Sequence, residues 1–334
     1  MSGRILVVGG AGYIGSHMVK LLLEQGEELL VLDDLSTGHR DAVLPDAPFV
    51  QGNSGDGALL DRLFRRHAFD AVTHFASSIN VGESVMQPGR YYSNNVGNTL
   101  TLLNAMARHG VPHFVFSSTA AIFGNPHATP IDEAQPQAPI NPYGKSKWMI
   151  EQVLPDYERA HGMHHVCLRY FNAAGADPDG MLGERHVPET HLIPLALRAA
   201  MGRSKRFTLY GDDYDTPDGS CIRDYIHVAD LCAAHLLAIR YLRGGGKSDR
   251  FNLGNGNGYS VRDVLRTVED IVGQPCRVQI AARRPGDPAR LVADASRAHS
   301  VLGWRPAYPD LRDIVSHAFH WEAAQEEGLA QVSG

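Results

Sequence analysis

Short apolar runs alternate with amphipathic stretches through the first half of the chain. The apolar runs predict buried strands at Arg4–Val8, Leu29–Leu32, Phe49–Gln51, Ala71–Phe75, His113–Phe116 and His165–Arg169. The amphipathic stretches predict helices near Tyr13–Gln25, Ala58–His67, Ser84–His109 and Pro142–His161. Apolar strands that alternate with helices are typical of a parallel sheet covered on both faces, so a doubly wound α/β domain is expected. Pro155 is expected to kink or interrupt the last helix because it lacks an N–H donor.

The pattern changes after Asn172. Residues 173–188 are rich in Gly, Pro and Asp and predict a loop that crosses to a second unit. The elements expected beyond it are a helix near Ile193–Met201, a strand near Phe207–Tyr210, a helix over Val228–Leu242 and a strand at Phe251–Leu253. A glycine-rich turn at 254–258 then leads to a helix starting at Ser260, with Asp263 as its capping partner. We therefore expect a first domain over 1–175, with a returning segment near 226–256, and a smaller α/β domain over 176–334.

A glycine-rich turn follows the first strand and opens the first helix. Gly9, Gly12 and Gly15 permit a tight turn and a close backbone approach to a pyrophosphate lying on the helix N-terminus. Asp33 ends the second strand and can accept hydrogen bonds from an adenosine ribose, while it would repel a 2′-phosphate. The pattern predicts a Rossmann-type dinucleotide site and favours NAD over NADP, with Arg40 as the one nearby residue that could accommodate the extra phosphate.

Tyr143 and Lys147 are four residues apart, and Asn141-Pro142 before them is typical of a helix N-cap followed by proline at the first position. The two side chains should therefore share one helix face. A lysine ammonium beside a phenol favours the phenolate, and a nicotinamide ring would add positive charge. Thr119 could hydrogen-bond the same substrate oxygen. This set predicts removal of a proton from an alcohol while a dinucleotide takes the hydride.

Composition narrows the function classes. The chain has 334 residues, 43% of them hydrophobic and 20% charged, and a net charge of −6, which disfavours nucleic-acid and anionic-membrane binding. No signal peptide or membrane-length apolar run is visible. The cysteines at 167, 221, 232 and 276 are widely spaced and suggest reduced thiols in a cytoplasmic protein. Neither His161, His164 and His165 nor His186 and His191 have a metal-site spacing, so no metal is expected.

Together these motifs resemble the extended short-chain dehydrogenase/reductase family, in particular its UDP-sugar 4-epimerases. The resemblance runs nearly end to end through Gly9–Ser16, Leu32–Arg40, His74–Ala76, Val81–Ser84, Tyr91–Val96, Ser117–Thr119, Asn141–Lys147, Leu168–Gly175, Gly219–Val228 and Arg283–Asp287. It implies Thr119, Tyr143 and Lys147 as catalytic residues. The implied reaction is reversible inversion at C4 of UDP-glucose and UDP-galactose through a 4-keto sugar, with transient reduction of bound NAD.

The resemblance also implies two sets of binding residues. Those expected to hold NAD, with Tyr143 and Lys147, are Gly9, Gly12, Tyr13, Ile14, Gly15, Asp33, Asp34, Leu35, Ser36, Thr37, Gly38, Asn53, Ser54, Phe75, Ala76, Asn95, Ser117 and Phe171. Those expected to line the UDP-sugar, with Thr119 and Tyr143, are Asn172, His191, Leu192, Thr208, Leu209, Tyr210, Arg223, Tyr225, Arg284, Asp287 and Leu291. The two arginines suit a pyrophosphate, and Asp287 can accept from a ribose hydroxyl.

Departures from the family pattern leave alternatives open. Asn53 stands where an Asp often faces the adenine amine, although its carbonyl could still accept that bond. Leu291 matches a position where bulk limits the space for an N-acetyl group. A 4-epimerase of another UDP-sugar, an N-acetylhexosamine or a pentose, remains an alternative. A nucleotide-sugar 4,6-dehydratase is disfavoured because Ala120 and Ala121 replace the Asp-Glu pair of those enzymes. Helices around Tyr92–Met106 and Tyr143–Tyr157 resemble those that pair in the family's homodimers.

Overall fold

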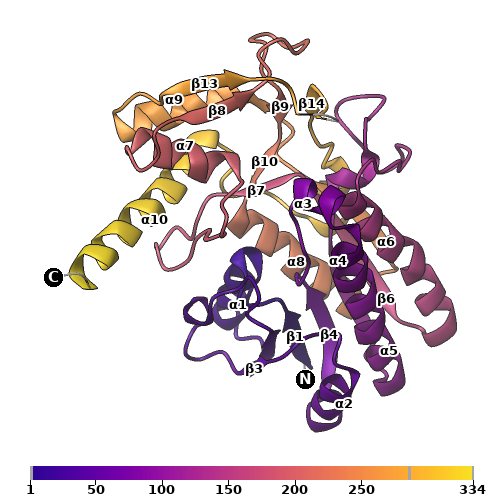
Figure 1. Ribbon diagram of the computed structural model, residues 1–334. Helices are drawn as coiled ribbons and strands as arrows, with labels where there is room; N and C mark the ends of the chain where they lie inside the picture. The colour runs from indigo at the N-terminus through magenta and orange to yellow at the C-terminus, as the bar shows by residue number, and fades with distance from the viewer. Residues whose placement is uncertain (1–2, 285–286, 333–334) are drawn as a thin grey trace.

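A seven-stranded parallel sheet forms the centre of the first half of the protein in this computed structural model, which describes residues 3–284 and 287–332 (Figure 1). Its strand order is β11-β6-β5-β4-β1-β2-β3. The bounds are β1 (Arg4–Val8), β2 (Leu29–Asp33), β3 (Phe49–Gln51), β4 (Phe69–His74), β5 (His113–Thr119), β6 (His164–Tyr170) and β11 (Asp249–Leu253). The order reverses between β1 and β4, which confirms the doubly wound prediction. Ligands of such sheets bind at the carboxyl ends of the strands near this switch.

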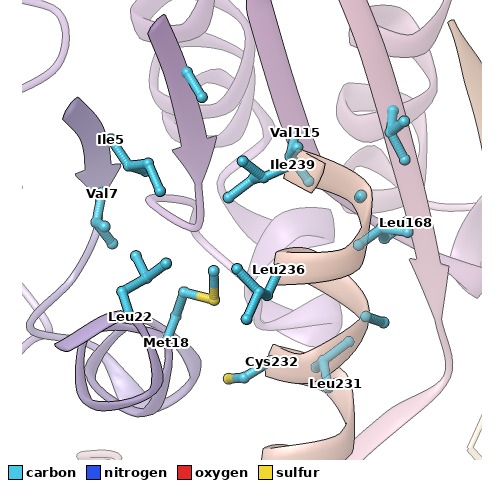
Figure 2. Packing of buried hydrophobic residues seen from close by; sticks show 14 of the residues in the cluster. Ile5, Val7, Met18, Leu22, Val115, Leu168, Leu231, Cys232, Leu236 and Ile239 are labelled. Carbon is cyan, nitrogen blue, oxygen red and sulfur yellow. The ribbon is translucent and has the colours of Figure 1, made fainter. Parts of the chain in front are cut away.

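Helices cover both faces of the sheet. One face packs against α1 (Tyr13–Glu24) and α8 (Val228–Arg243), and the other against α2 (Gly57–Arg66), α5 (Thr99–His109) and α6 (Pro142–His161). Figure 2 shows the first of these layers, with Met18 and Leu22 of α1 facing Leu236 of α8 beside the β1 residues Ile5 and Val7. Because both faces are buried, the strands are apolar on both sides, as their sequences predicted.

Two of the helix predictions need correction. The stretch predicted as one helix over Ser84–His109 is α3 (Val81–Met86), α4 (Pro88–Tyr91), a π-helical segment η2 (Tyr92–Asn98) and α5. Pro88 ends α3 because the residue before a proline is pushed out of the helical region. Pro155, in contrast, does not interrupt α6, which is continuous from Pro142 to His161. Ile150 and Leu154, on the same helix, are buried in the core between the sheet and α2, α5 and α6. This packing keeps α6 helical at Pro155 although one backbone hydrogen bond is missing.

A separate hydrophobic core lies in the second half of the chain. It joins α7 (Leu192–Ala200), α9 (Val261–Val272), α10 (Leu311–Val332) and β8 (Phe207–Tyr210). The strand β13 (Val278–Ala281) pairs in parallel with β8 at the edge of this core. Ser260 and Asp263 form the predicted capping box at the start of α9. The long helix α10 was not predicted. None of the helices within residues 3–284 and 287–332 combines the length and apolarity needed to cross a bilayer.

The remaining elements are short. These are η1 (Arg40–Ala42), η3 (Ala120–Phe123), β7 (Asn172–Ala174), β9 (Ile222–Arg223), β10 (Tyr225–His227), β12 (Tyr259–Ser260), β14 (Arg290–Leu291) and η4 (Ala298–Leu302). The chain returns to the large sheet through α8 and β11, in the segment expected near 226–256. It returns once more at Trp304, which is fully buried in the core between the sheet and the helices α1 and α8. The division into 1–175 and 176–334 stays a prediction that did not foresee this second return.

The glycine turn between β1 and α1 depends on a close backbone approach. Gly9 has a φ of +84°, a left-handed conformation that favours glycine. A Cβ on Gly15 would overlap the carbonyl oxygen of Gly9 and lie 2.8 Å from the Cα of Gly10. Both neighbours are backbone atoms and cannot rotate away, so only glycine fits at the start of α1.

Gly15→Ala is therefore expected to lower the free energy of unfolding by about 1–3 kcal/mol, the usual cost of overpacking. The clash should outweigh the roughly 1 kcal/mol by which alanine is the better helix former. Gly89→Ala in α4 is the matched control, because a Cβ there meets nothing within 4 Å. The control should be neutral or slightly stabilising. Urea denaturation of both variants measures the difference, and equal midpoints would contradict the steric argument.

Candidate active site

The three predicted catalytic residues meet where α6 packs against the end of β5. Thr119 is the last residue of β5, and Tyr143 and Lys147 lie in the first turns of α6. The side chain of Asn141 accepts a hydrogen bond from the Gly144 amide at 2.8 Å, so α6 begins where the sequence predicted. Thr119 lies near enough to Tyr143 that its side chain acts to lower the pKa of the phenol. The structure thus brings a phenol and a hydroxyl together at the carboxyl edge of the sheet.

Lys147 lies one turn deeper and is 2% exposed. Its Nζ donates to the carbonyl oxygen of Ser117 at 2.8 Å and to Ser77 Oγ at 2.7 Å. It also lies 4.8 Å from the ring centroid of Phe116. Burial lowers the pKa of Lys147 to about 7, against the opposing effect of Glu151. The two hydrogen-bond acceptors of Lys147, a hydroxyl and a backbone carbonyl, are both uncharged.

The pKa of Tyr143 differs from the sequence-based expectation. Lys147 was expected to favour the phenolate, but the protein groups alone raise the pKa of Tyr143, because burial outweighs the lowering effect of the Thr119 side chain. A buried phenol loses the water that would stabilise its anion, and Lys147 directs its ammonium toward Ser117 and Ser77. Positive charge from a bound dinucleotide would lower the pKa of Tyr143 and so favour removal of a proton by this phenol.

A buried charged network lies behind these residues and was missed by sequence reasoning. Glu151 accepts a hydrogen bond from Ser118 Oγ at 2.5 Å and a forked pair from Arg169, whose Nη2 lies 2.5 Å from Glu151 Oε2. Arg169 is fully buried and Glu151 nearly so, so each charge needs the other. The signal in the sequence was the spacing, since Glu151 follows Lys147 by four residues on the same helix face. This network holds α6 to β5 and β6.

Three of the residues predicted to hold NAD lie close to Lys147 and to the adjoining helix α8. Asn95 is 2% exposed, accepts from the Ser78 amide at 2.8 Å and donates to Ser146 Oγ at 3.0 Å, which joins the loop after β4 to α6. Ser117 Oγ lies 2.9 Å from His235 Nε2 of α8. Phe75 stacks near the same imidazole, with 4.8 Å between ring centroids. Phe75 follows β4 and Ser117 lies near the end of β5, where a Rossmann-type sheet binds its ligand, while Asn95 reaches the loop after β4 from η2.

The predicted adenosine-side residues lie at the ends of β1 and β2. Asp33 is 8% exposed, and its two oxygens accept hydrogen bonds from the amides of Ala11 at 2.9 Å and Leu35 at 2.8 Å. Burial raises the pKa of Asp33, and these two bonds oppose the shift. The carboxylate therefore supports the glycine turn itself, and each oxygen keeps a second lone pair for a ribose hydroxyl.

Asp34 and Asn53 support each other beside this turn. Asn53 Nδ2 donates to Asp34 Oδ2 at 2.7 Å, and Asn53 Oδ1 accepts from the Gly55 amide at 2.7 Å. The hydrogen bonds that Asp34 accepts from Ser36 and Asn53 lower its pKa despite partial burial. The carbonyl of Asn53 thus already has one partner, and only its second lone pair could accept from an adenine amine. No sequence signal indicated the Gly55 bond.

The remaining predicted cofactor residues follow the same edge. Tyr13, Ile14 and Gly15 open α1, and Gly9 and Gly12 lie in the preceding turn. The loop after β2 supplies Leu35, Ser36, Thr37 and Gly38, and it is held by a hydrogen bond from the His39 amide to the Ala11 carbonyl at 2.9 Å. Ser54 lies between β3 and α2, Ala76 follows β4, and Phe171 lies between β6 and β7. The fold brings together residues that are up to 162 positions apart in the chain.

The predicted UDP-sugar residues come from the second half of the chain. Arg223 on β9 donates to Asp287 Oδ1 at 2.7 Å, which joins two residues predicted to bind the nucleotide. Arg284 lies over the ring of Tyr210, with 4.0 Å between its Cζ and the ring centroid. Both guanidinium groups are thus positioned by neighbours from the predicted set.

Strand pairing places the rest of this set. Tyr225 on β10 lies opposite Asn172 on β7. The side-chain Nδ2 of Asn172 donates to the Asp224 carbonyl at 2.8 Å. Leu291 on β14 lies opposite Arg223 and packs with Phe171 against the small core formed by Ala120, Ile122, Phe123 and Ile131. Thr208, Leu209 and Tyr210 lie on β8, and His191 and Leu192 lie at the N-terminus of α7.

Known proteins resemble this chain in sequence and fold over nearly its whole length. A UDP-glucose 4-epimerase of Halalkalibacterium halodurans is 53% identical over 326 residues, which cover 98% of this chain and 97% of the relative. The crystal structure of a UDP-glucose 4-epimerase from Brucella ovis in complex with NAD has a TM-score of 0.93 and 49% identity, covering 96% of this chain and 98% of that one. Another from Bifidobacterium longum, in complex with NAD⁺ and UDP, has a TM-score of 0.92 and 38% identity, covering 97% and 99%. Residues 5–254 match the model of the NAD dependent epimerase/dehydratase family, so the chain belongs to that family.

Proposed function

We propose that this protein interconverts UDP-glucose and UDP-galactose by reversible inversion at C4, with NAD as a tightly held cofactor. The observation that carries the proposal is the docking of Tyr143 and the buried Lys147 of α6 onto the end of β5, where Thr119 lies, with Lys147 Nζ bonded to the Ser117 carbonyl. The similarity of the whole chain to UDP-glucose 4-epimerases supports the choice of sugar.

The side chains account for the proton part of the reaction. Tyr143 removes the proton of the C4 hydroxyl, and Thr119 orients that oxygen by hydrogen bonding. Bound NAD would supply the acceptor and then the donor of the C4 hydride. The hydride would return to the opposite face once the 4-keto sugar has turned in the site, and Tyr143 returns the proton to the C4 oxygen. One acid/base residue is enough, because the proton and the hydride that leave the sugar are both returned to it.

The binding residues divide between the two ligands. The glycine turn, Asp33 and the loop at 34–38 would hold the adenosine and pyrophosphate of NAD, and the residues that surround Lys147 would hold its nicotinamide. Arg223 and Arg284 would bind the pyrophosphate of the UDP-sugar as forked donors. Asp287, now paired with Arg223, would exchange that partner for a ribose hydroxyl. These contacts anchor the nucleotide while the ketosugar turns.

A 4,6-dehydratase on the same scaffold is disfavoured by the residues next to Thr119. Such an enzyme must remove a proton at C5 and protonate the leaving C6 hydroxyl. Ala120 and Ala121 open the short helix η3 directly after Thr119, and their methyl groups cannot transfer protons. The remaining alternatives are therefore other UDP-sugars undergoing the same inversion.

Tyr143→Phe is expected to lower kcat by about 10²–10⁴-fold, the usual contribution of a positioned acid/base group, while NAD stays bound. Tyr241→Phe is the control, because it removes a hydroxyl near the far end of α8. A coupled assay of UDP-galactose conversion gives kcat, and the nucleotide released on denaturation gives the NAD content. Turnover of Tyr143→Phe close to that of the unmodified protein would remove this residue from the mechanism.

Leu291 is expected to restrict the sugar. Its side chain and that of Phe171 pack against the small core that follows β5, so the N-acetyl group of a bound sugar should meet Leu291. UDP-N-acetylglucosamine should therefore be converted more slowly than UDP-glucose. Leu291→Ala should raise kcat/KM for the N-acetylated sugar relative to UDP-glucose by roughly 10-fold, the effect of a few methylene groups. Val301→Ala, at an exposed site, serves as the control. Comparable rates on both sugars before mutation would refute the restriction.

We also propose a cytoplasmic homodimer. The cysteines within the described residues, at 167, 221, 232 and 276, are all buried free thiols, which suits a reducing compartment. The segments expected to pair, 92–106 and 143–157, lie on the same face of the sheet, and Met149 of α6 is 42% exposed there.

Light scattering at micromolar concentration is expected to give about twice the 36.4 kDa chain mass. Met149→Glu should shift the protein toward monomer, because a charge buried in a helix-pairing face loses its hydration. Met181→Glu, at another exposed methionine in the loop after β7, should leave the mass unchanged. Only monomer in the unmodified protein would contradict the dimer.

A further inference from the structure

Two histidines and two glutamates converge in the loop between β7 and α7. Their ligand atoms, one from each of Glu184, His186, Glu189 and His191, all lie within 4.8 Å of one another. Glu184 Oε1 accepts from His186 Nδ1 at 3.0 Å and also contacts His191 Nδ1. Glu189 Oε1 lies 3.9 Å from His186 Nδ1 and 3.8 Å from His191 Nδ1. Four donors from a stretch of eight residues thus face one point.

One buried carboxylate oxygen of this cluster lacks a hydrogen-bond partner within the part of the chain that the structure describes. The side chains of Glu184 and Glu189 are only 5% and 2% exposed. Glu189 Oε1 accepts from the amides of Thr190 and His191, while Glu189 Oε2 is buried and has no hydrogen-bond partner among the described residues. A buried carboxylate oxygen without a partner is costly, and a cation in the cluster would satisfy it.

The donor geometry is close to that of a zinc site. Bonds of about 2.0–2.2 Å to imidazole nitrogen and carboxylate oxygen place neighbouring ligand atoms of a tetrahedral site about 3.3–3.5 Å apart. The separations of 3.0, 3.8 and 3.9 Å lie on both sides of this value, the Glu184–His191 contact is shorter and no pair exceeds 4.8 Å, so side-chain rotation must even out the spacing when an ion binds. The His191 side chain is 45% exposed, which gives an ion a route from solvent. Imidazole with carboxylate suits Zn²⁺ and similar first-row ions.

We propose that Glu184, His186, Glu189 and His191 bind one divalent transition-metal ion of the zinc class. This site goes beyond the proposed epimerisation, and the metal takes no part in the proton transfer by Tyr143. The spacing of His186 and His191 alone predicted no metal site, and the proposal differs because it adds Glu184 and Glu189 as ligands.

The ion pins the loop that crosses to the second half of the chain. His186 lies edge-on to Tyr13 of α1, with 6.3 Å between ring centroids, and the Tyr13 hydroxyl donates to the Gly175 carbonyl at 2.7 Å. The carbonyl of Glu184 accepts from the indole of Trp321 on α10 at 3.3 Å. The loop that carries the four ligands thus lies between α1, which packs on the large sheet, and α10, which belongs to the core of the second half of the chain.

The test is a Zn²⁺ titration of the chelator-treated holoprotein by calorimetry. We expect saturable binding of one ion per chain and a rise in the thermal midpoint. Glu189→Gln, which keeps the side-chain volume, and His186→Ala should each weaken binding by at least about 100-fold, since loss of supporting contacts alone costs 10–100-fold. His127→Ala, an exposed histidine outside the cluster, should bind as the unmodified protein does.

Co²⁺ gives a second readout that needs no activity. The four ligands should produce the intense visible absorption of tetrahedral Co²⁺, and Glu189→Gln should lose it. Circular dichroism of each variant checks its fold. Absence of saturable Zn²⁺ binding by the unmodified protein would overturn the proposal. Equal binding by folded Glu189→Gln would do the same, since the ion would then be held by other histidines.

Discussion

The buried ammonium of Lys147 is the constraint on which the site depends. Removing an ammonium from water is costly unless polar groups replace the lost hydration. Lys147 finds these groups in the carbonyl of Ser117 on β5 and the hydroxyl of Ser77 after β4. Both are available only when α6 is docked across the ends of two strands. The same docking brings Tyr143, one helical turn earlier, close to Thr119.

The network behind Lys147 makes this docking specific. Glu151 and Arg169 are buried together, and neither charge tolerates the loss of its partner. Because Glu151 lies on α6 and Arg169 on β6, a shift of the helix by one turn would separate them. Ser118 adds a third contact, to the strand that ends in Thr119. The charged pair therefore sets the register at which the catalytic face of α6 meets the sheet.

The sheet topology explains why the two ligand sites adjoin. The strand order reverses at β1 and β4, so the loops after these strands diverge and leave the carboxyl edge open. The glycine turn and Asp33 lie on one side of that point, and Ser77, Ser117 and Thr119 lie on the other. The second half of the chain reaches the same edge through β7 and β10, and it brings Arg223 and Leu291 on the adjoining strands β9 and β14.

The sequence by itself determined the alternating strands and helices, the glycine turn, the cap at Asn141 and the pairing of Tyr143 with Lys147, because each depends on residues a few positions apart. It did not determine the partners of Glu151 or the raised pKa of Tyr143. It also did not reveal that Glu184 and Glu189 converge on two histidines, or that Trp304 returns to the core between the sheet and the helices α1 and α8. Only the tertiary structure decided these features, since burial and side-chain partners arise when distant segments pack together. A pattern along the chain records which residues can form an element, while the free energy of a charge depends on what surrounds it in space.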